Sequence, residues 1–323
     1  MASLLSVENL QVQFQTKKGI NTAVDGVSFS VEKGRILGIV GESGCGKSVT
    51  SMSILQLLGS NARISGGSIK LDGKELIGLP EKEMCRIRGN DIAMIFQDPM
   101  TALNPTLTIG TQLMEPIMLH QNCGKKEAWT RAVDVLKRVG IAAPEKRMKE
   151  YPHQLSGGMR QRVMIAMAVS CEPRLLIADE PTTALDVTIQ AQILELMCEL
   201  REKMGTAIML ITHDMGVVAE TADDVLVLYA GKAVEYGSIE DIFERPKHPY
   251  TQGLLNSIPR LDEDVELLNT IEGTVPAPDA MPAGCRFAPR CPYGKDHCMK
   301  EKPGVYHAGN SLVSCFRYEG EKE

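Results

Sequence analysis

The sequence has no apolar run long enough to cross a membrane as a helix. A spanning helix needs about 20 consecutive apolar residues. The longest candidate here, residues 163–171, is about half that length and is flanked by Arg162 and Glu172. We therefore expect the chain to reach a membrane only through a partner protein.

A secretory signal is also missing. The first residues, MASLLSVENLQVQF, contain no basic stretch followed by an apolar block, which is the pattern of a signal peptide. We therefore expect the chain to stay in the cytoplasm. Its nine cysteines should accordingly be reduced thiols or metal ligands and not disulfides.

An excess of positive charge is lacking as well. Lysine and arginine total 35 against 41 aspartates and glutamates, which gives a formal net charge of −6. A general nucleic-acid coat needs a positive face to release counterions from phosphates, so we expect no nucleic-acid partner. The 43% hydrophobic and 24% charged residues are typical of a globular protein, and 323 residues allow one large and one small domain.

Short apolar runs alternate with longer segments of helical period, which predicts an α/β fold. The runs are apolar throughout, as expected for parallel strands with helices on both faces; they comprise residues 35–40, 91–96, 175–178, 207–211 and 225–229. Two N-terminal segments, residues 4–14 and 24–31, alternate instead and predict an antiparallel sheet.

Strand signals are missing between residues 99 and 168. Helical periodicity there predicts helices at residues 111–121, 127–139 and 158–168, so we expect an inserted helical subdomain at about residues 98–170. Beyond residue 245 the composition changes and ends in a tail rich in proline and cysteine. The sequence therefore predicts a large domain over residues 1–245 and a C-terminal domain over residues 246–323.

Residues 41–48 read GESGCGKS and match the phosphate-binding pattern G-x-x-x-x-G-K-[ST]. The segment follows an expected strand and precedes an expected helix at residues 47–58, which argues against a chance glycine-rich turn. The glycines let backbone N–H groups converge on phosphate oxygens, and the helix N-terminus adds partial positive charge. The expected nucleotide contacts are Gly41, Glu42, Ser43, Gly44, Cys45, Gly46, Lys47, Ser48 and Val49.

A pair of acids supports this interpretation. The expected strand LLIADE ends in Asp179 and Glu180. Two adjacent acids on a surface loop are usually a solvated pair, but here they follow a buried strand downstream of a phosphate loop. We expect Asp179 to hold a magnesium ion and Glu180 to polarise the attacking water.

Further motifs resemble those of ABC-transporter ATPases. LSGGM at residues 155–159, followed by RQR, is similar to the signature of that family. Gln97 in IFQDP matches its glutamine loop, and His213 in LITHD matches its switch histidine. Residues 184–186, Ala-Leu-Asp, match its D-loop. The order and spacing of these motifs match over about 250 residues.

The resemblance implies a P-loop NTPase core with an antiparallel β subdomain and an inserted helical subdomain. Two subunits would pair head to tail, so that each ATP lies between the phosphate loop of one subunit and the signature of the other. Gln97 would sense magnesium and the nucleophilic water, and His213 would hold the γ-phosphate and orient Glu180. The expected contacts in trans are Ser156, Gly157 and Gly158, with Asp186 in the D-loop; the expected magnesium ligands are Ser48, Gln97 and Asp179.

Phe14 lies where this family places an aromatic ring against the adenine. A core aromatic on the first strand is an equally good explanation of the same residue. Cys45, inside the phosphate loop, is most simply a small side chain that fits there; a redox role is the alternative. The sequence leaves both alternatives open.

Three segments resemble the ATPases of bacterial dipeptide and oligopeptide importers, a group that includes nickel importers. They are residues 151–168, residues 176–194 and the HPYTQGLL motif at residues 248–255, and the resemblance is greatest to the dipeptide-permease D-type ATPase. It implies an identical or paralogous ATPase partner, two membrane permease subunits and, indirectly, an extracytoplasmic peptide-binding protein. The chain would then lie at the cytoplasmic face of the membrane. Alternatives are an importer of nickel or another small solute and a stand-alone ABC-type ATPase.

The tail contains four cysteines with the spacing C-x5-C-x6-C-x16-C: Cys285, Cys291, Cys298 and Cys315. A small tail of this composition buries little apolar surface and needs a staple. Zinc sites usually contain C-x2-4-C pairs, which this tail lacks, and longer loops favour an iron–sulfur cluster. The tail also resembles that of peptide-importer ATPases, which implies a [4Fe–4S] cluster; zinc or bare thiols are the alternatives.

Overall fold

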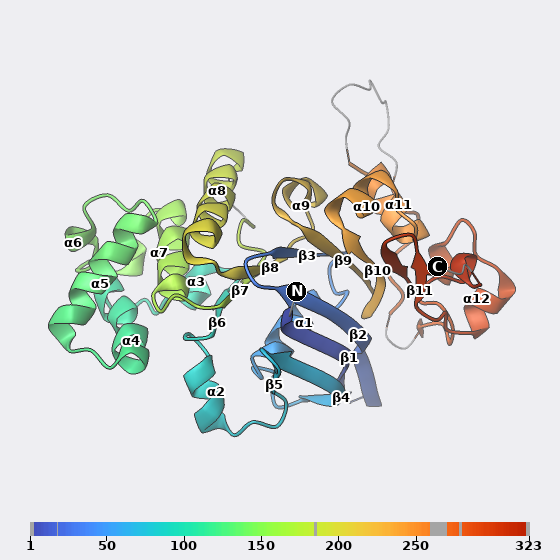
Figure 1. The fold of residues 1–323 in the computed structure, drawn as a ribbon, viewed down its shortest axis with the longest axis horizontal. Coiled ribbons are helices and arrows are strands. Elements are labelled where there is room, and N and C mark those ends of the chain that lie inside the picture. Colours follow the sequence, from blue (N-terminus) through green and yellow to red (C-terminus); the bar gives the residue numbers. More distant parts are fainter. Residues whose placement is uncertain (1–2, 18, 184–185, 259–269, 278–279, 321–323) are drawn as a thin grey trace. The chain divides into compact units, whose positions relative to one another are not determined.

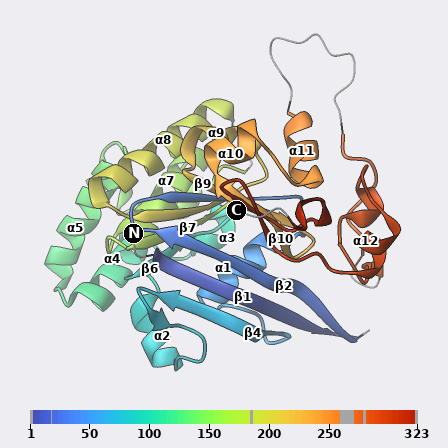
Figure 2. The same cartoon turned by 45° about the vertical axis from the view of Figure 1, so that its right-hand side comes forward.

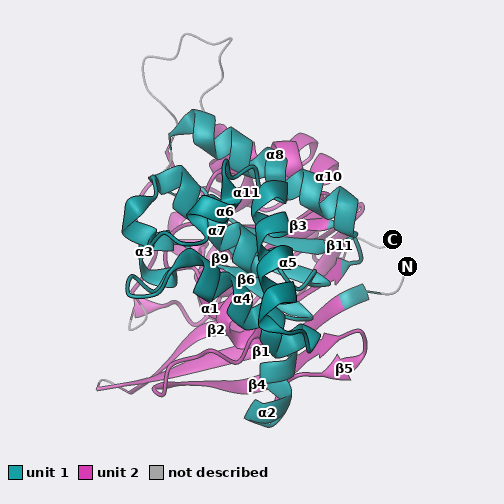
Figure 3. Ribbon diagram, turned by 90° about the vertical axis from the view of Figure 1, so that its left-hand side faces the viewer, with its two compact units in different colours: residues 1–4, 32–35, 78–211 teal, residues 5–31, 36–77, 212–323 magenta. Residues whose placement is uncertain are grey.

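The computed structural model describes residues 3–17, 19–183, 186–258, 270–277 and 280–320. The chain forms two compact units (Figure 3). Unit 1 comprises residues 1–4, 32–35 and 78–211, and unit 2 comprises residues 5–31, 36–77 and 212–323. Among the described residues, none of the helices combines the length and the apolar character needed to cross a membrane.

Unit 2 contains the predicted antiparallel sheet. Its strand order is β2-β1-β4-β5, and β1 runs antiparallel to β4 with Leu5 opposite Leu71. The sequence predicted β1 from alternating apolar and polar residues, and many of those apolar side chains are buried in the structure. The strands are β1 (Ser3–Thr16), β2 (Gly19–Glu32), β4 (Ala62–Leu71) and β5 (Lys74–Glu75).

Unit 2 also contains a run of neighbouring strands that carries the phosphate loop. Within this unit their order is β11-β12-β10-β9-β3. β3 is entirely buried and runs parallel to β9, whereas β10 runs antiparallel to β9. The strands are β3 (Ile36–Val40), β9 (Asp224–Tyr229), β10 (Lys232–Ser238), β11 (Tyr306–Ala308) and β12 (Ser311–Val313).

The helices of unit 2 are short. Helix α9 packs directly on β3, because a Cβ atom built on Gly38 would lie 2.8 Å from Cγ1 of Val218. The helices are α1 (Lys47–Ile54), α9 (Met215–Thr221), α10 (Ile239–Glu244), α11 (Pro249–Asn256) and α12 (Asp296–Lys300), with 3-10 turns η3 (Ala288–Arg290) and η4 (Phe316–Tyr318). The predicted helix at residues 47–58 is therefore shorter than expected, ending at Ile54.

Three parallel strands form the centre of unit 1. β7 (Leu175–Asp179) pairs with β6 (Ile92–Ile95) on one side and β8 (Ala207–Ile211) on the other. Every residue of β7 and β8 is buried, as their uninterrupted apolar sequences predicted. Helix α8 (Val187–Met204) connects β7 to β8, and α2 (Glu81–Ile87) precedes β6.

The predicted helical insertion is present between β6 and β7. Every residue of this segment is described, and none of them forms a strand. Its main helices α4, α5 and α7 pack against one another, and the three predicted helices correspond to them within two residues at each end. They appear in green at the left of Figure 1. The elements are α3 (Pro99–Ala102), α4 (Ile109–Gln121), α5 (Lys125–Arg138), α6 (Pro144–Arg147), η1 (Pro152–Gln154) and α7 (Gly157–Val169).

The compact units do not follow the boundary expected at residue 246. The C-terminal segment adds β11 and β12 to the same sheet as β3, with Glu235 opposite Val313, and it belongs to one unit with the N-terminal sheet. In Figure 2 its red strands lie beside β10. The reason is that β10 offers a free edge, and pairing that edge satisfies its backbone groups.

Candidate functional site

The phosphate loop, residues 41–48, lies in a backbone conformation that only glycine accepts at its first position. Gly41 has a φ of 150°, and a Cβ atom built there would lie 2.1 Å from the carbonyl oxygen of Leu228 in β9. Gly44 and Gly46 have φ values of 76° and 98°, in the region that side chains rarely adopt. The glycines of the motif are thus required by the turn itself.

Lys47 and Ser48 open helix α1 at the end of this loop. The Lys47 side chain is buried within the loop, and its Nζ donates to the carbonyl oxygen of Gly41 at 2.7 Å and of Glu42 at 3.2 Å. Helix α1 has no side-chain cap at Gly46 and no acid in its first turn, and Ser48 is exposed. An uncapped helix N-terminus beside an ammonium group is suited to binding phosphate.

Cys45 and Val49 are placed by packing. Cys45 is 1% exposed, and burial raises the pKa of its thiol. This agrees with the simpler of the two interpretations of that cysteine, a small side chain that fills the space beneath the loop. Ser43 and Gly44 are exposed, whereas Val49 is half-buried on the first turn of α1.

The two acids occupy the end of β7 in unit 1. Asp179 is the last residue of the strand and is buried. Glu180 follows with a φ of +46°, an unfavourable conformation for a residue with a side chain. Its N–H donates to the carbonyl oxygen of Ile211 at 2.9 Å. Backbone strain of this kind persists only where the surroundings hold the residue in place.

The side chain of Glu180 is held by two polar partners. Nε2 of Gln97 donates to Glu180 Oε2 at 2.8 Å, and Oγ1 of Thr183 donates to the same oxygen at 3.0 Å. The structure therefore brings together the predicted catalytic glutamate and the predicted glutamine-loop residue, 83 positions apart in the sequence. Thr183 was not predicted; its position three residues after Glu180 in a turn is the signal that sequence reasoning missed.

The signature residues begin helix α7. Ser156 is the N-cap, and its side chain accepts from the N–H of Met159 at 3.4 Å. Ser156 and Gly157 are exposed, so their backbone is accessible to a ligand. Gly158 faces Ile189 on α8, where an added Cβ atom would lie 3.3 Å from Cγ2 of Ile189.

The remaining predicted site residues are exposed or half-buried. Asp186 is exposed and caps α8 by accepting from the N–H of Ile189 at 2.9 Å; Ala184 and Leu185 of the D-loop lie outside the described residues. His213 is exposed in unit 2, so it is not a core histidine. Phe14 is half-buried on β1, which speaks against a fully buried core aromatic.

The four cysteines of the tail line one small cavity of about 70 Å³ in unit 2. Phe287 and Phe316 form its apolar walls, and His297 lies beside Cys298 at 3.6 Å between Nε2 and Sγ. Burial raises the pKa of Cys285 to about 11, and it also raises the pKa of Cys291 and of Cys315. Such thiols remain protonated at neutral pH until a metal displaces the proton.

The arrangement of these thiols bears on which metal group they suit. A tetrahedral zinc site with bonds of about 2.3 Å holds its sulfurs roughly 3.8 Å apart. Within the described part of the chain, no group of three or more histidine, cysteine, aspartate or glutamate side chains is gathered closely enough to hold a metal ion. The four cysteines share one cavity without forming a site for a single ion.

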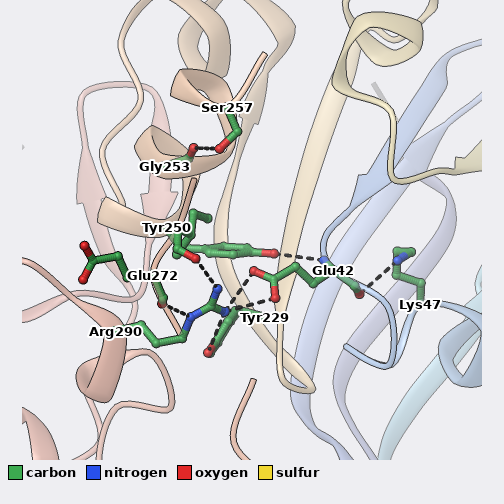
Figure 4. A network of polar contacts seen from close by, with 9 residues as sticks. Glu42, Lys47, Tyr229, Tyr250, Gly253, Ser257, Glu272 and Arg290 are labelled. Atoms are coloured by element: carbon green, nitrogen blue, oxygen red, sulfur yellow. Dashed lines mark hydrogen bonds and ion pairs between the residues drawn. The ribbon is translucent and has the colours of Figure 1, made fainter. Parts of the chain in front are cut away.

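Sequence reasoning also missed a contact between this tail and the phosphate loop (Figure 4). The N–H of Glu42 donates to the hydroxyl oxygen of Tyr250 at 2.9 Å, and Nη1 of Arg290 lies 2.9 Å from a carboxylate oxygen of Glu42. Burial raises the pKa of the Tyr250 hydroxyl. The motif HPYTQGLL was the available signal, but nothing in it shows what Tyr250 contacts.

Comparisons with known proteins agree with these motifs. Residues 24–183 match the family model for the ABC transporter, and residues 234–298 match the model for the oligopeptide/dipeptide transporter, C-terminal region. The oligopeptide transport ATP-binding protein AppD of Bacillus subtilis is 56% identical and covers 99% of this chain and 98% of its own. The oligopeptide transport ATP-binding protein OppD of Escherichia coli is 52% identical over 98% of this chain and 93% of its own.

Solved structures show the same fold. The ATP-binding cassette MJ0796, solved as a dimer in a post-hydrolysis state bound to ADP and Pi, is 27% identical with a TM-score of 0.66 and covers 73% of this chain and 98% of its own. The protein cbiO1 of Clostridium perfringens, part of the ABC transporter complex cbiONQ, is 28% identical with a TM-score of 0.65 and covers 76% of this chain and 92% of its own.

The glycines of the phosphate loop allow a matched test. Gly41→Ala should destabilise the protein by about 3 kcal/mol, because the new methyl group overlaps the backbone of β9, and it should abolish nucleotide binding. Gly44→Ala is the control: nothing lies within 4 Å of its Cβ position, so only the left-handed backbone cost of about 1–2 kcal/mol applies. Denaturant unfolding and binding of a fluorescent ATP analogue measure both. Equal stability of the two variants would contradict the assigned loop geometry.

Proposed function

The chain belongs to the ATP-binding subunits of bacterial oligopeptide and dipeptide ABC importers, and from this we propose how its residues bind and hydrolyse ATP and what they energise. It is an ABC ATPase that couples ATP hydrolysis to transport. The match of residues 234–298 to the C-terminal region of peptide transporters carries the assignment to this branch of the family. The residue roles below are our proposal.

Residues 41–49 bind the nucleotide. The exposed N-terminus of α1 and the backbone N–H groups of the loop receive the phosphates, and Lys47 leaves the carbonyl oxygens of Gly41 and Glu42 to contact the outer phosphates. Phe14 stacks on the adenine ring. Ser48, Gln97 and Asp179 would hold a magnesium ion, which would neutralise charge on the phosphates.

Hydrolysis takes place at a site shared between two subunits arranged head to tail. Ser156 and the N–H groups of Gly157 and Gly158 contact the γ-phosphate bound by the partner, which the exposure of Ser156 and Gly157 supports. Asp186 lies at the same interface. The dimeric state of the ATP-binding cassette MJ0796 is consistent with such a pairing.

Glu180 is the general base in this proposal. Water attacks the γ-phosphorus, Glu180 accepts a proton from that water, and ADP leaves with the electrons of the broken bond. The hydrogen bond from Gln97 Nε2 at 2.8 Å orients the carboxylate toward the water. His213 holds the γ-phosphate and orients Glu180, and the residues contribute mainly by positioning and electrostatics.

The cargo is a dipeptide or an oligopeptide. The relatives AppD and OppD are named for oligopeptide transport, and DppD of Bacillus subtilis, 54% identical over the whole of this chain, is named for dipeptide transport. The importer is completed by an identical or paralogous ATPase, two permease subunits and an extracytoplasmic peptide-binding protein. In this assembly the chain lies at the cytoplasmic face of the membrane.

We further propose that the tail binds a [4Fe–4S] cluster through Cys285, Cys291, Cys298 and Cys315. All four line one cavity, which fits a four-thiolate donor set.

A transport assay tests the cargo. Vesicles containing the assembled importer should accumulate a labelled dipeptide or oligopeptide in an ATP-dependent manner, and ATP turnover should rise when the permease subunits and the loaded binding protein are present. Uptake of nickel without peptide would instead support the small-solute alternative. Rapid turnover by the isolated chain, unchanged by the membrane subunits, would favour a stand-alone ATPase.

Glu180→Gln tests the catalytic assignment. The amide keeps the size of the side chain but cannot accept a proton, so turnover should fall at least about 100-fold, while ATP binding remains and an ATP-bound dimer accumulates. Glu199→Gln, an exposed glutamate paired with Lys203 on α8, is the control and should retain activity. Undiminished hydrolysis by Glu180→Gln would refute the role of Glu180.

Metal analysis tests the cluster. Anaerobically purified protein should contain about four irons and acid-labile sulfide per chain, and Cys291→Ser should lower both. Cys85→Ser is the control, because Cys85 is exposed on α2. One zinc per chain without sulfide would replace the cluster with a zinc site.

A further inference from the structure

Arg290 uses almost its whole guanidinium group to join the cysteine-bearing tail to the phosphate loop. Its side chain is 6% exposed. Nη1 donates to both carboxylate oxygens of Glu42 at 2.9 and 3.0 Å and lies 3.3 Å from the hydroxyl oxygen of Tyr229. Nε and Nη2 donate to the carbonyl oxygens of Glu272 and Ile271 at 2.9 and 3.2 Å. With so many hydrogen-bond partners, the guanidinium group of Arg290 is held in one orientation.

Glu42, the second residue of the phosphate loop, is held on its other sides as well. Its N–H donates to Tyr250 at 2.9 Å, and its carbonyl oxygen accepts from Nζ of Lys47 at 3.2 Å. Figure 4 shows Arg290, Glu42 and Lys47 in one continuous chain of contacts. Arg290 and Lys47 therefore contact the same residue of the loop, Arg290 at the carboxylate of Glu42 and Lys47 at its backbone carbonyl oxygen.

The charge of Glu42 makes this contact matter for nucleotide binding. Its carboxylate belongs to the loop that receives the anionic phosphates, and like charges at close range repel strongly where solvent is partly excluded. Arg290 offsets that charge through both carboxylate oxygens. Without Arg290, Glu42 would be free to turn toward the phosphates and would weaken their binding.

The position of Arg290 depends on the cysteine cavity. It is the last residue of η3 and precedes Cys291. Phe287, 2% exposed, lines the same cavity and packs against Tyr229 and Tyr250 with ring centroids 5.1 and 5.4 Å apart. The aromatic cluster thus extends from the cysteine cavity to Tyr250, which contacts the loop.

A second arginine next to a tail cysteine also contacts residues near the phosphate loop. Arg286 follows Cys285, and its Nη2 lies 3.0 Å from Oδ2 of Asp25, while Nη1 donates to the carbonyl oxygen of Ala230. The next residue, Gly231, donates its N–H to the carbonyl oxygen of Cys45 within the loop at 2.8 Å. Two cysteines of the tail are therefore each next to an arginine that leads to the phosphate loop.

We propose that Arg290 is a positioning residue for the phosphate loop, and that through it the cysteine-bearing tail sets the affinity of the subunit for ATP. The proposal goes beyond the assigned hydrolysis and transport. It requires only that residues 41–48 bind the nucleotide, and it holds for whatever group occupies the cysteine cavity.

The first experiment measures the Kd of a fluorescent ATP analogue for the full-length chain and for Arg290→Ala, Arg290→Lys, Glu42→Gln and the Arg290→Ala/Glu42→Gln double variant. Arg290→Ala should raise Kd about tenfold. The double variant should recover most of that loss, because its neutral amide no longer repels phosphate. Arg290→Lys should lie between wild type and Arg290→Ala, because lysine keeps the charge but not the paired hydrogen bonds.

The matched control is Arg245→Ala, which removes an exposed arginine paired with Asp241 in the same unit and should leave Kd unchanged. In the assembled importer, Arg290→Ala should raise KM for ATP with little change in kcat. A double variant that binds ATP as weakly as Arg290→Ala would overturn the proposal, because loss of folding or packing alone is not rescued by Glu42→Gln. Lys47→Ala serves separately: if it binds ATP normally, the loop assignment itself is wrong.

The second experiment tests the connection to the cysteines. Cys291→Ser should change Kd for ATP in the presence of Arg290 and should have no further effect in the Arg290→Ala background. A Kd that Cys291→Ser leaves unchanged in the wild-type background, or changes equally in both backgrounds, would show that the tail does not act through Arg290.

Discussion

The close approach of Gly41 to β9 determines the geometry of the nucleotide site. The backbone at Gly41 lies so near the carbonyl group of Leu228 that no side chain fits between them, and this contact fixes where the loop leaves β3. The later glycines of the loop can then turn its N–H groups inward, and α1 begins at Lys47 with its N-terminus uncapped. Every proposed phosphate contact depends on that path of the chain.

A comparable constraint acts in unit 1 at Glu180. The strand β7 is buried along its length and ends in an acid, and the next residue adopts a positive φ. This conformation is unfavourable for glutamate, but it is held by the N–H bond to Ile211 and by the side chains of Gln97 and Thr183. The strain leaves the carboxylate fixed beside its partners, as expected of a catalytic group.

The C-terminal tail belongs to the same compact unit as the phosphate loop. It contributes β11 and β12 to the sheet that holds β3. Phe287 of the tail packs on Tyr250, and Arg290 bonds to Glu42 of the phosphate loop. The sequence predicted a separate domain because its composition changes near residue 246. Amino-acid composition reflects only the local sequence, whereas the position of the tail depends on its pairing with the free edge of β10.

Local signals in the sequence were enough to predict most of the elements and the class of chemistry. Uninterrupted apolar runs identified the buried strands, helical periodicity identified the insertion, and the GESGCGKS pattern with the acids after β7 identified an ATPase, because each of these signals is local in the chain. Which distant groups meet depends on tertiary packing. The pair of Gln97 with Glu180 and the pair of Glu42 with Arg290, 248 residues apart, arise only when buried strands and aromatic rings pack together. That packing depends on the whole core, so no local pattern in the sequence predicts it.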